Sequence, residues 1–218
     1  AERQRLFIGG VTHEFKTPLT ALLLHTRMLR RANMTEEEKN GSLAHIESQC
    51  EWLERLVQTL LRIITLDREI ERKPCAVDVL FDRVRQNTQK SLADRGVTLN
   101  TLSDGGTLLV NADLIQSLLI NLVDNAAKAY DTGMENRKVC LTVSGSTIEV
   151  SDNGRGIPKE ALPRIFEPFY MVDKSRSKKS GGSGLGLTLV RKIADAHDAE
   201  LTVESSVEKG TTVRVHFQ

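Results

Sequence analysis

A heptad pattern of inward-facing side chains is the feature that most constrains the fold. Between residues 43 and 64 these side chains recur at alternating steps of three and four, which is typical of a helix in a coiled coil or bundle. Thr35 followed by Glu38 predicts a capping box at the start of this helix. An earlier stretch has similar spacing, and a short link near 33–35 would join both helices into an antiparallel hairpin. One hairpin holds half the core of a four-helix bundle, so we expect residues 1–70 to form a homodimer. The seam positions are Phe15, Leu19, Leu22, Thr26 and Leu29, then Leu43, Ile46, Cys50, Leu53, Val57, Leu60 and Ile64.

The sequence changes character after residue 70. The charged segment that ends at Pro74 is typical of a domain boundary, so we expect a linker over 71–74 and a second domain over 75–218. In that second domain, short β-rich runs come in pairs, and helical stretches alternate with them. The pattern predicts an α+β protein, in which the helical hairpin is followed by an α/β sandwich with helices on one sheet face. We expect hairpins over 138–143 with 147–151 and 201–205 with 211–217, and helices over 78–94, 112–131 and 185–197.

The composition excludes several classes of protein. The chain has 30 Lys and Arg against 29 Asp and Glu, a formal net charge of +1, so we expect no nucleic-acid partner. Its three cysteines are widely spaced, which argues against a disulfide framework or a zinc site and fits a reducing compartment. No apolar run approaches the ~18 residues that a membrane span needs. Because the chain begins inside a helical pattern, we expect a cytoplasmic fragment of a longer protein with no membrane contact of its own.

His13 is the first candidate for chemistry. It lies beside the first seam, and a helical histidine is most often simply packed or exposed. Here the neighbouring Glu14 can accept its proton or orient its ring. Pro18 removes the N–H that would bond the carbonyl of residue 14, which costs about 3 kcal/mol in a helix interior. Thr17 stands where the second histidine of an HExxH zinc motif would be, so a zinc peptidase is excluded.

A polar stripe on a later helix is the second candidate. Asn121, Asn125 and Lys128 are spaced to share one helix face. Asparagine is a weak helix former, so two on one face need a reason. A carboxamide oxygen can ligate Mg²⁺, which commonly shares its oxygen ligands with nucleotide phosphates, and Lys128 adds a positive charge. The alternative is an ordinary solvated face.

Two glycine-rich segments complete the set of candidates. Residues 152–158 follow a predicted strand and could be an ordinary turn. Alternatively, Asp152 accepts a hydrogen bond from an amino group such as that of adenine, and the glycines allow close backbone approach. Residues 181–188 open a helix whose free N–H groups favour phosphate. This second segment is neither a Walker A loop nor a GxGxxG motif, because Ser183 interrupts the glycines.

Taken together and in this order, the motifs make the chain resemble a sensor histidine kinase of a two-component system over essentially all 218 residues. The resemblance implies a dimerisation and histidine-phosphotransfer domain, followed by a Bergerat-type ATP-binding domain with an ATP lid over 171–183. It also implies that the full-length protein is anchored in the bacterial cell membrane. The matching segments are 13–18 (H-box), 121–128 (N-box), 152–156 (first glycine box), 165–170 (F-box) and 182–187 (second glycine box).

The resemblance also implies cofactors, a partner and roles for individual residues. ATP with Mg²⁺ would phosphorylate His13, Glu14 would assist as base, and the phosphoryl group would pass to an aspartate of a response regulator. Glu14 and Thr17 resemble the E-x-x-T pattern used to dephosphorylate that regulator. Asn125 would hold Mg²⁺ and Asp152 the adenine amino group. The other implied nucleotide contacts are Asn121, Lys128, Gly154, Gly156, Lys174, Arg176, Gly182, Gly184, Leu185 and Gly186.

Among the departures from the family pattern, two lie in the second domain. The aromatic residue that often follows the N-box lysine is replaced by Ala129, with Tyr130 one place later. Residues 196–199 replace the usual His-Gly-Gly turn. Neither departure touches the core chemistry.

Two alternatives compete with this interpretation. A gyrase-like or mismatch-repair-like ATPase has the same ATP fold but carries a glutamate, as base for water, where this chain has Asn121. An asparagine cannot take a proton, so transfer to protein is favoured over hydrolysis. The other alternative is a non-catalytic scaffold that binds nucleotide for signalling, and the intact His13 and Asn125 argue against it.

Overall fold

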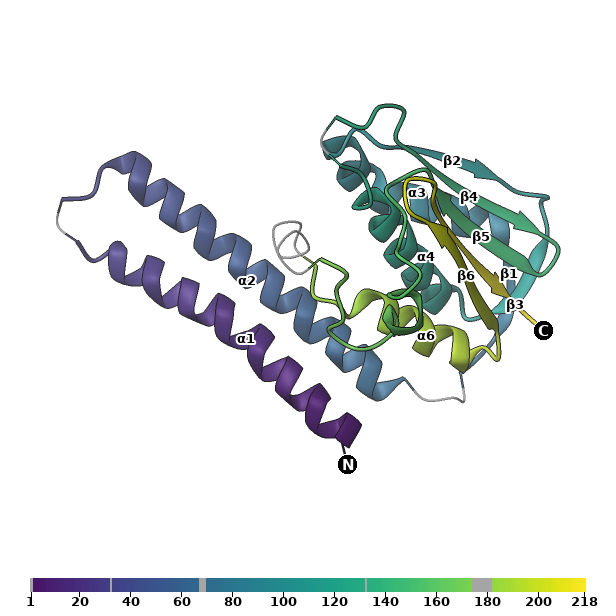
Figure 1. Cartoon of the computed structure of the whole chain (residues 1–218), viewed down its shortest axis with the longest axis horizontal. Coiled ribbons are helices and arrows are strands. Elements are labelled where there is room, and N and C mark those ends of the chain that lie inside the picture. Colours follow the sequence, from purple (N-terminus) through teal and green to yellow (C-terminus); the bar gives the residue numbers. More distant parts are fainter. Residues whose placement is uncertain (1, 32, 67–69, 132, 174–181) are drawn as a thin grey trace.

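In the computed structural model, a long helical hairpin is followed by a layer of helices packed on a β-sheet (Figure 1). The sheet and its helices form an α/β sandwich, as the sequence predicts. Lys174 and Arg176, two of the predicted phosphate contacts, lie outside the described residues. The structure describes residues 2–31, 33–66, 70–131, 133–173 and 182–218.

The hairpin is made of α1 (Glu2–Met28) and α2 (Glu36–Thr65). The predicted capping box is present: the Glu38 amide donates to Thr35 Oγ1 (3.2 Å), and the Thr35 amide donates to Glu38 Oε2 (2.9 Å). Both N-terminal amides therefore have partners, and the start of α2 is well defined. Helix α1 continues through Pro18 to Met28.

Half of the twelve predicted seam residues are exposed in the single chain, whereas Leu60 is buried. Leu19, Leu43 and Ile64 are 53%, 52% and 65% exposed. Among the described side chains of α1, the buried ones are instead those of Glu14 and Pro18, one position earlier in the repeat. The exposed apolar side chains of the seam therefore lie on the outside of the hairpin, on the kind of surface that packs in a bundle.

The main sheet has five strands in the order β2-β4-β5-β7-β6. Strand β2 pairs in parallel with β4, and the other neighbours are antiparallel. The two predicted hairpins, β4 with β5 and β6 with β7, are confirmed. A separate two-stranded ribbon joins β1 and β3. The strands are β1 (Lys73–Ala76), β2 (Thr98–Leu102), β3 (Thr107–Val110), β4 (Lys138–Ser144), β5 (Thr147–Asp152), β6 (Glu200–Ser206) and β7 (Gly210–His216).

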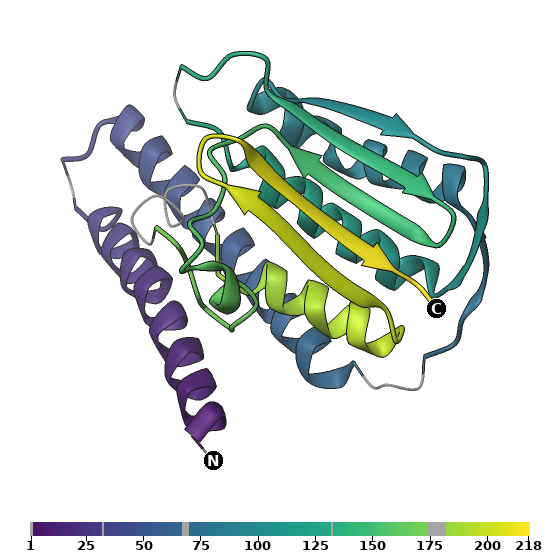
Figure 2. The same cartoon turned by 45° about the vertical axis from the view of Figure 1, so that its right-hand side comes forward.

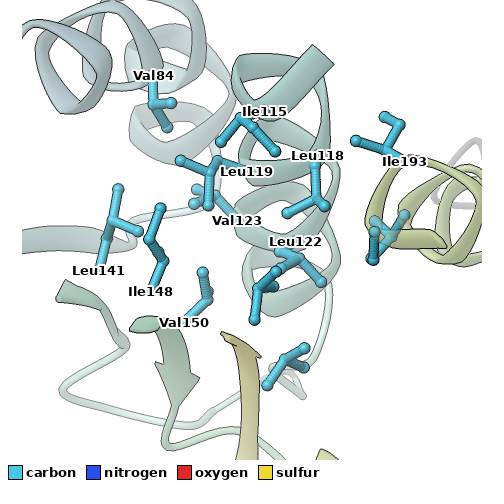
Figure 3. Close-up of a cluster of buried hydrophobic side chains, with 14 of the residues drawn as sticks. Val84, Ile115, Leu118, Leu119, Leu122, Val123, Leu141, Ile148, Val150 and Ile193 are labelled. Atoms are coloured by element: carbon cyan, nitrogen blue, oxygen red, sulfur yellow. The ribbon is translucent and has the colours of Figure 1, made fainter. Parts of the chain in front are cut away.

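Three helices, α3 (Val77–Asp94), α4 (Ala112–Ala127) and α6 (Gly186–Ala196), lie on one face of this sheet (Figure 2). The predicted helices are present, although α4 ends four residues before the expected 131. A 3-10 turn forms over Leu162–Arg164. Figure 3 shows α4 at the centre, with its apolar side chains directed at the sheet and the neighbouring helices. The fully buried residues of α4 include Ile115, Leu118, Leu119 and Val123.

Helix α2 packs against the sandwich as well as against α1 (Figure 1). Leu56, Leu60 and Ile63 are buried and join the core that α4 and the sheet share. Near them, Arg62 Nη1 donates a hydrogen bond to Ser117 Oγ (2.8 Å). Among the described residues, no helix is long and apolar enough to cross a membrane.

Candidate functional site

A cavity of about 830 Å³ lies between α2, α4 and the ends of the central strands. That volume lies within the usual range for small-molecule and cofactor sites. Of the residues predicted to bind nucleotide, those that line it are Asn121, Asn125, Lys128, Asp152, Gly156, Gly184 and Gly186.

Helix α4 places Asn121 and Asn125 on the wall of this cavity. Asn121 Nδ2 donates to the Ser117 carbonyl (2.8 Å), whereas Asn125 Nδ2 is buried and has no hydrogen-bond partner among the described residues. The oxygen and nitrogen of an asparagine side chain are distinguished by their hydrogen-bond partners, and Asn125 Nδ2 has none within the described ranges. The side chain is therefore equally compatible with a 180° flip that exchanges its oxygen and nitrogen. Asn125 can thus present an oxygen to a cation. No cluster of three or more His, Cys, Asp or Glu suited to a metal occurs in the described part of the chain.

Lys128 follows at the end of α4. Burial of its ammonium group lowers its pKa, and the nearby carboxylate of Asp124 opposes that shift. Arg95 and Arg55 lower the pKa further, because both bring positive charge close to it. Lys128, Arg55 and Arg95 line the cavity together with the carboxylates of Asp94, Asp124 and Asp152, so cationic groups are available there to an anionic ligand.

Asp152 ends β5 at the opposite side of the site. Its Oδ1 accepts a hydrogen bond from the Gly154 amide (2.8 Å), which holds the carboxylate in place. Burial raises its pKa to about 6, although the amides of Gly154 and Thr211 favour the charged form. Gly156 has φ +70°, and a Cβ there would lie 1.9 Å from the Ser206 carbonyl oxygen, so this turn requires glycine.

Tyr130 does not replace the missing aromatic residue. Its ring is buried, 7% exposed, and does not line the cavity, which Ala129 does. The hydroxyl lies 2.8 Å from Asn153 Oδ1. Burial raises the pKa of Tyr130 to about 12. Tyr130 therefore supports the loop behind the site.

Gly184 connects the cavity to α1 through Phe169. The Phe169 amide donates to the Gly184 carbonyl (2.9 Å), and both residues have positive φ (+62° and +70°). The ring of Phe169 packs on Gly10 of α1 so closely that a Cβ there would be 2.3 Å from Phe169 Cδ2. The Phe7 ring lies nearby, with centroids 5.8 Å apart. The sequence analysis included Phe169 in the F-box motif but did not predict its contact with α1. The pair Gly9-Gly10 inside a helix was the sequence feature that could have indicated a close approach there.

His13, Glu14 and Thr17 lie on α1, and none of these described residues lines the cavity. The His13 side chain is 66% exposed, and its Nδ1 is 3.0 Å from Oε1 of the almost buried Glu14. Thr17 is exposed. The phosphoacceptor candidates and the cavity are therefore separate in this arrangement. Of the remaining predicted contacts, Gly154, Gly182 and Leu185 lie outside the cavity lining.

One side of the cavity was not anticipated. Helix α2 contributes Trp52, Arg55 and Thr59 to its lining. These residues belong to the helical hairpin, which the sequence analysis predicts to be a separate domain. None of them belongs to a motif that would indicate nucleotide binding.

Comparisons with known proteins agree with this architecture. Residues 3–69 match the "His Kinase A (phospho-acceptor) domain", and residues 110–218 match the "Histidine kinase-, DNA gyrase B-, and HSP90-like ATPase" family. The chain is 34% identical to sensor histidine kinase YkoH of Bacillus subtilis, over 99% of this chain and 48% of that protein. It is 31% identical to the phosphate regulon sensor protein PhoR of Pseudomonas aeruginosa, over 97% and 49%.

Solved structures show the same fold. Full-length ShkA in complex with AMPPNP matches with a TM-score of 0.70 and 26% identity, over 95% of this chain and 44% of that one. Histidine kinase ThkA, in complex with response regulator protein TrrA, matches with a TM-score of 0.72 and 24% identity, over 99% and 63%. The fold and the matched families define a protein with a phosphoacceptor hairpin joined to a Bergerat-type ATP-binding domain. The chain belongs to the sensor histidine kinase family. It spans about half the length of the curated relatives named here, 48% and 49%.

Proposed function

We propose that this chain binds ATP in the cavity and transfers the γ-phosphoryl group to His13. The observation that carries the proposal is the convergence of Asn121, Asn125 and Lys128 with Asp152 in one cavity of about 830 Å³. The Asp152 carboxylate can accept a hydrogen bond from the adenine amino group. Lys128 and the side-chain amide of Asn121 can bind the phosphates. Mg²⁺ held by Asn125 would neutralise charge on the phosphates.

The His13–Glu14 pair supports the choice of acceptor. If His13 Nδ1–H donates a hydrogen bond to Glu14 across the observed 3.0 Å, the ring is held in the tautomer whose Nε2 lone pair is free to attack, and Glu14 can take the Nδ1 proton once the ring is phosphorylated. A bond then forms between Nε2 and the γ-phosphorus, the bond from that phosphorus to the bridging oxygen breaks, and ADP leaves. Glu14 stabilises the positive charge that develops on the ring. Because His13 lies outside the cavity lining here, the imidazole and the nucleotide must be brought together by another arrangement, within one chain or between two.

Hydrolysis is the weaker alternative. Asn121, at the position of the base in related ATPases, donates through its amide to Ser117 and cannot accept a proton from water.

Labelling with γ-labelled ATP and Mg²⁺ tests this proposal. The wild-type chain should acquire an acid-labile, alkali-stable phosphoramidate. Asn125→Ala should reduce Mg²⁺-ATP affinity by about tenfold or more, because it removes a ligand to the metal–phosphate group. Asn100→Ala, on β2 outside the cavity lining, is the control. Release of inorganic phosphate without any labelled protein would contradict the proposal.

The raised pKa of Asp152 predicts a pH dependence of purine binding. The carboxylate accepts a hydrogen bond from the adenine amino group only when ionised, so protons compete with the ligand as pH falls through about 6. Adenosine affinity should be constant above about pH 7 and fall by up to roughly tenfold per pH unit below the pKa. Adenosine is the ligand of choice because it has no titrating phosphate. In Asp152→Asn the affinity should be low and independent of pH, and a parallel pH profile in that variant would exclude this role.

We also propose a homodimer through residues 1–70, with a response regulator aspartate as recipient of the phosphoryl group. The exposed seam, with Leu19 and Leu43 more than half exposed, supports the dimer. The exposed His13 and family membership support the transfer. The relatives are sensor proteins about twice as long, which supports a cytoplasmic part of a membrane-anchored sensor.

Dephosphorylation of the regulator is a further part of the proposal. Thr17 is exposed one helical turn after Glu14, where its hydroxyl can position a water against a docked acyl phosphate. Thr17→Ala should slow dephosphorylation by about tenfold or more while self-labelling stays intact. The test measures decay of phosphorylated regulator with each variant. Normal decay with Thr17→Ala would remove this role.

A further inference from the structure

Helix α2 forms one wall of the nucleotide cavity. Trp52, Arg55 and Thr59 line the cavity along successive turns of this helix. The wall is held by buried Leu56, which joins the common core, and further along by the bond from Arg62 to Ser117 (2.8 Å). The backbone carbonyl of Ser117 accepts a hydrogen bond from Asn121 Nδ2 (2.8 Å). Helix α2 is therefore fixed to α4 one turn from Asn121, a predicted phosphate contact.

Arg55 adds a positive charge to this wall. It is close enough to Lys128 for its charge to disfavour the protonated ammonium group, as Arg95 also does from the end of α3. The pair that Arg55 makes with Glu51 is long (3.6 Å), and both side chains are mostly exposed (64% and 60%). Such a surface pair is weak and leaves the guanidinium free to change partner. The carboxylates of Asp94 and Asp124 line the same cavity and offset part of the repulsion between these cations, and a bound anion would offset more of it.

We propose that Arg55 of α2 binds the phosphate groups of the nucleotide, so that one nucleotide bridges the helical hairpin and the ATP-binding domain. This inference rests on the proposed binding of ATP in the cavity. The planar guanidinium suits bidentate contact with phosphate, and α2 carries it to the same cavity as Lys128. The bridge requires phosphates, so adenosine alone cannot form it.

Trp52 provides the measurement, because it is the single tryptophan of the chain and lines the same cavity. Its fluorescence is followed while Mg²⁺-ATP or adenosine is titrated into the whole chain, and calorimetry gives the same constants independently. Arg55→Gln should weaken ATP binding by about tenfold and leave adenosine binding unchanged. The matched control is Lys39→Gln, which removes one positive charge from the same helix far from the cavity. Its ATP affinity should equal that of the wild type.

Each outcome has a defined meaning. Wild-type ATP affinity in Arg55→Gln overturns the inference, and so does an equal loss for ATP and adenosine, which would indicate a disturbed cavity. An equal loss in Lys39→Gln would show a general effect of charge and overturn it too. Failure of the proposed function is separate: the wild type would not bind ATP, or Asn125→Ala would bind it normally.

Discussion

Replacing His13 by glutamine is expected to abolish the acid-labile phosphoprotein. Glutamine keeps the size and polarity of the side chain but has no nucleophilic nitrogen, so the loss should be several orders of magnitude. The side chain is 66% exposed and outside the cavity lining, so ATP affinity should stay within about twofold of the wild type. The free energy of unfolding should change by no more than about 0.5 kcal/mol. The measurement is incorporation of γ-label beside a direct titration of ATP.

Two further variants test whether the reaction takes place at the pair formed by His13 and Glu14. Glu14→Gln should lower the labelling rate by about 10²- to 10⁴-fold, because the ring loses the carboxylate that fixes its tautomer and stabilises its charge. Thr17→Ala should be labelled normally. The hairpin contains two other histidines, His25 and His45, whose rings stack with centroids 4.8 Å apart. Undiminished label in His13→Gln would move the acceptor to one of them or elsewhere.

Local patterns in the sequence predicted much of this fold. The capping box at Thr35, both β-hairpins and the three helices of the sandwich follow from neighbouring residues, and the structure has them all. Strands β1 to β3 were missed. Strand β2 pairs with β4, about forty residues later in the chain, and β1 pairs with β3, so both pairings depend on distant partners. The polar residues at the ends of β5 and α4 converge because these elements are neighbours in the sandwich.

Contacts between the two regions could not be read from the sequence. The heptad pattern shows which residues are apolar but not which partner covers them, so the inward face of α1 was placed one position late. For the same reason nothing marked Arg55 as part of the cavity, because its turn of α2 resembles any charged helix surface. The contact between Phe169 and Gly10 likewise depends on how the sandwich sits against α1.

Adjacent glycines in α1 allow that contact to be tested with a matched pair of variants. Gly9→Ala meets nothing within 4 Å and should stabilise the helix by about 0.5–1 kcal/mol. Gly10→Ala brings the same gain in helix propensity, but its Cβ would lie 2.3 Å from Phe169 Cδ2, so the ring must move away. Hydrogen exchange at the Phe169 amide, which donates to Gly184, reports that movement. It should rise roughly tenfold or more in Gly10→Ala and stay unchanged in Gly9→Ala.

The consequence for catalysis follows from the position of His13. Phe169 holds α1 three residues before His13, in an arrangement where that histidine does not line the cavity. Releasing the ring should therefore raise the rate of His13 labelling in Gly10→Ala, and Phe169→Ala should raise it similarly. In the double variant the two effects should not add, because both remove one contact. A slower rate in Gly10→Ala with faster exchange at Phe169 would mean that this contact belongs to the reactive arrangement, because its loss would then separate His13 from the nucleotide.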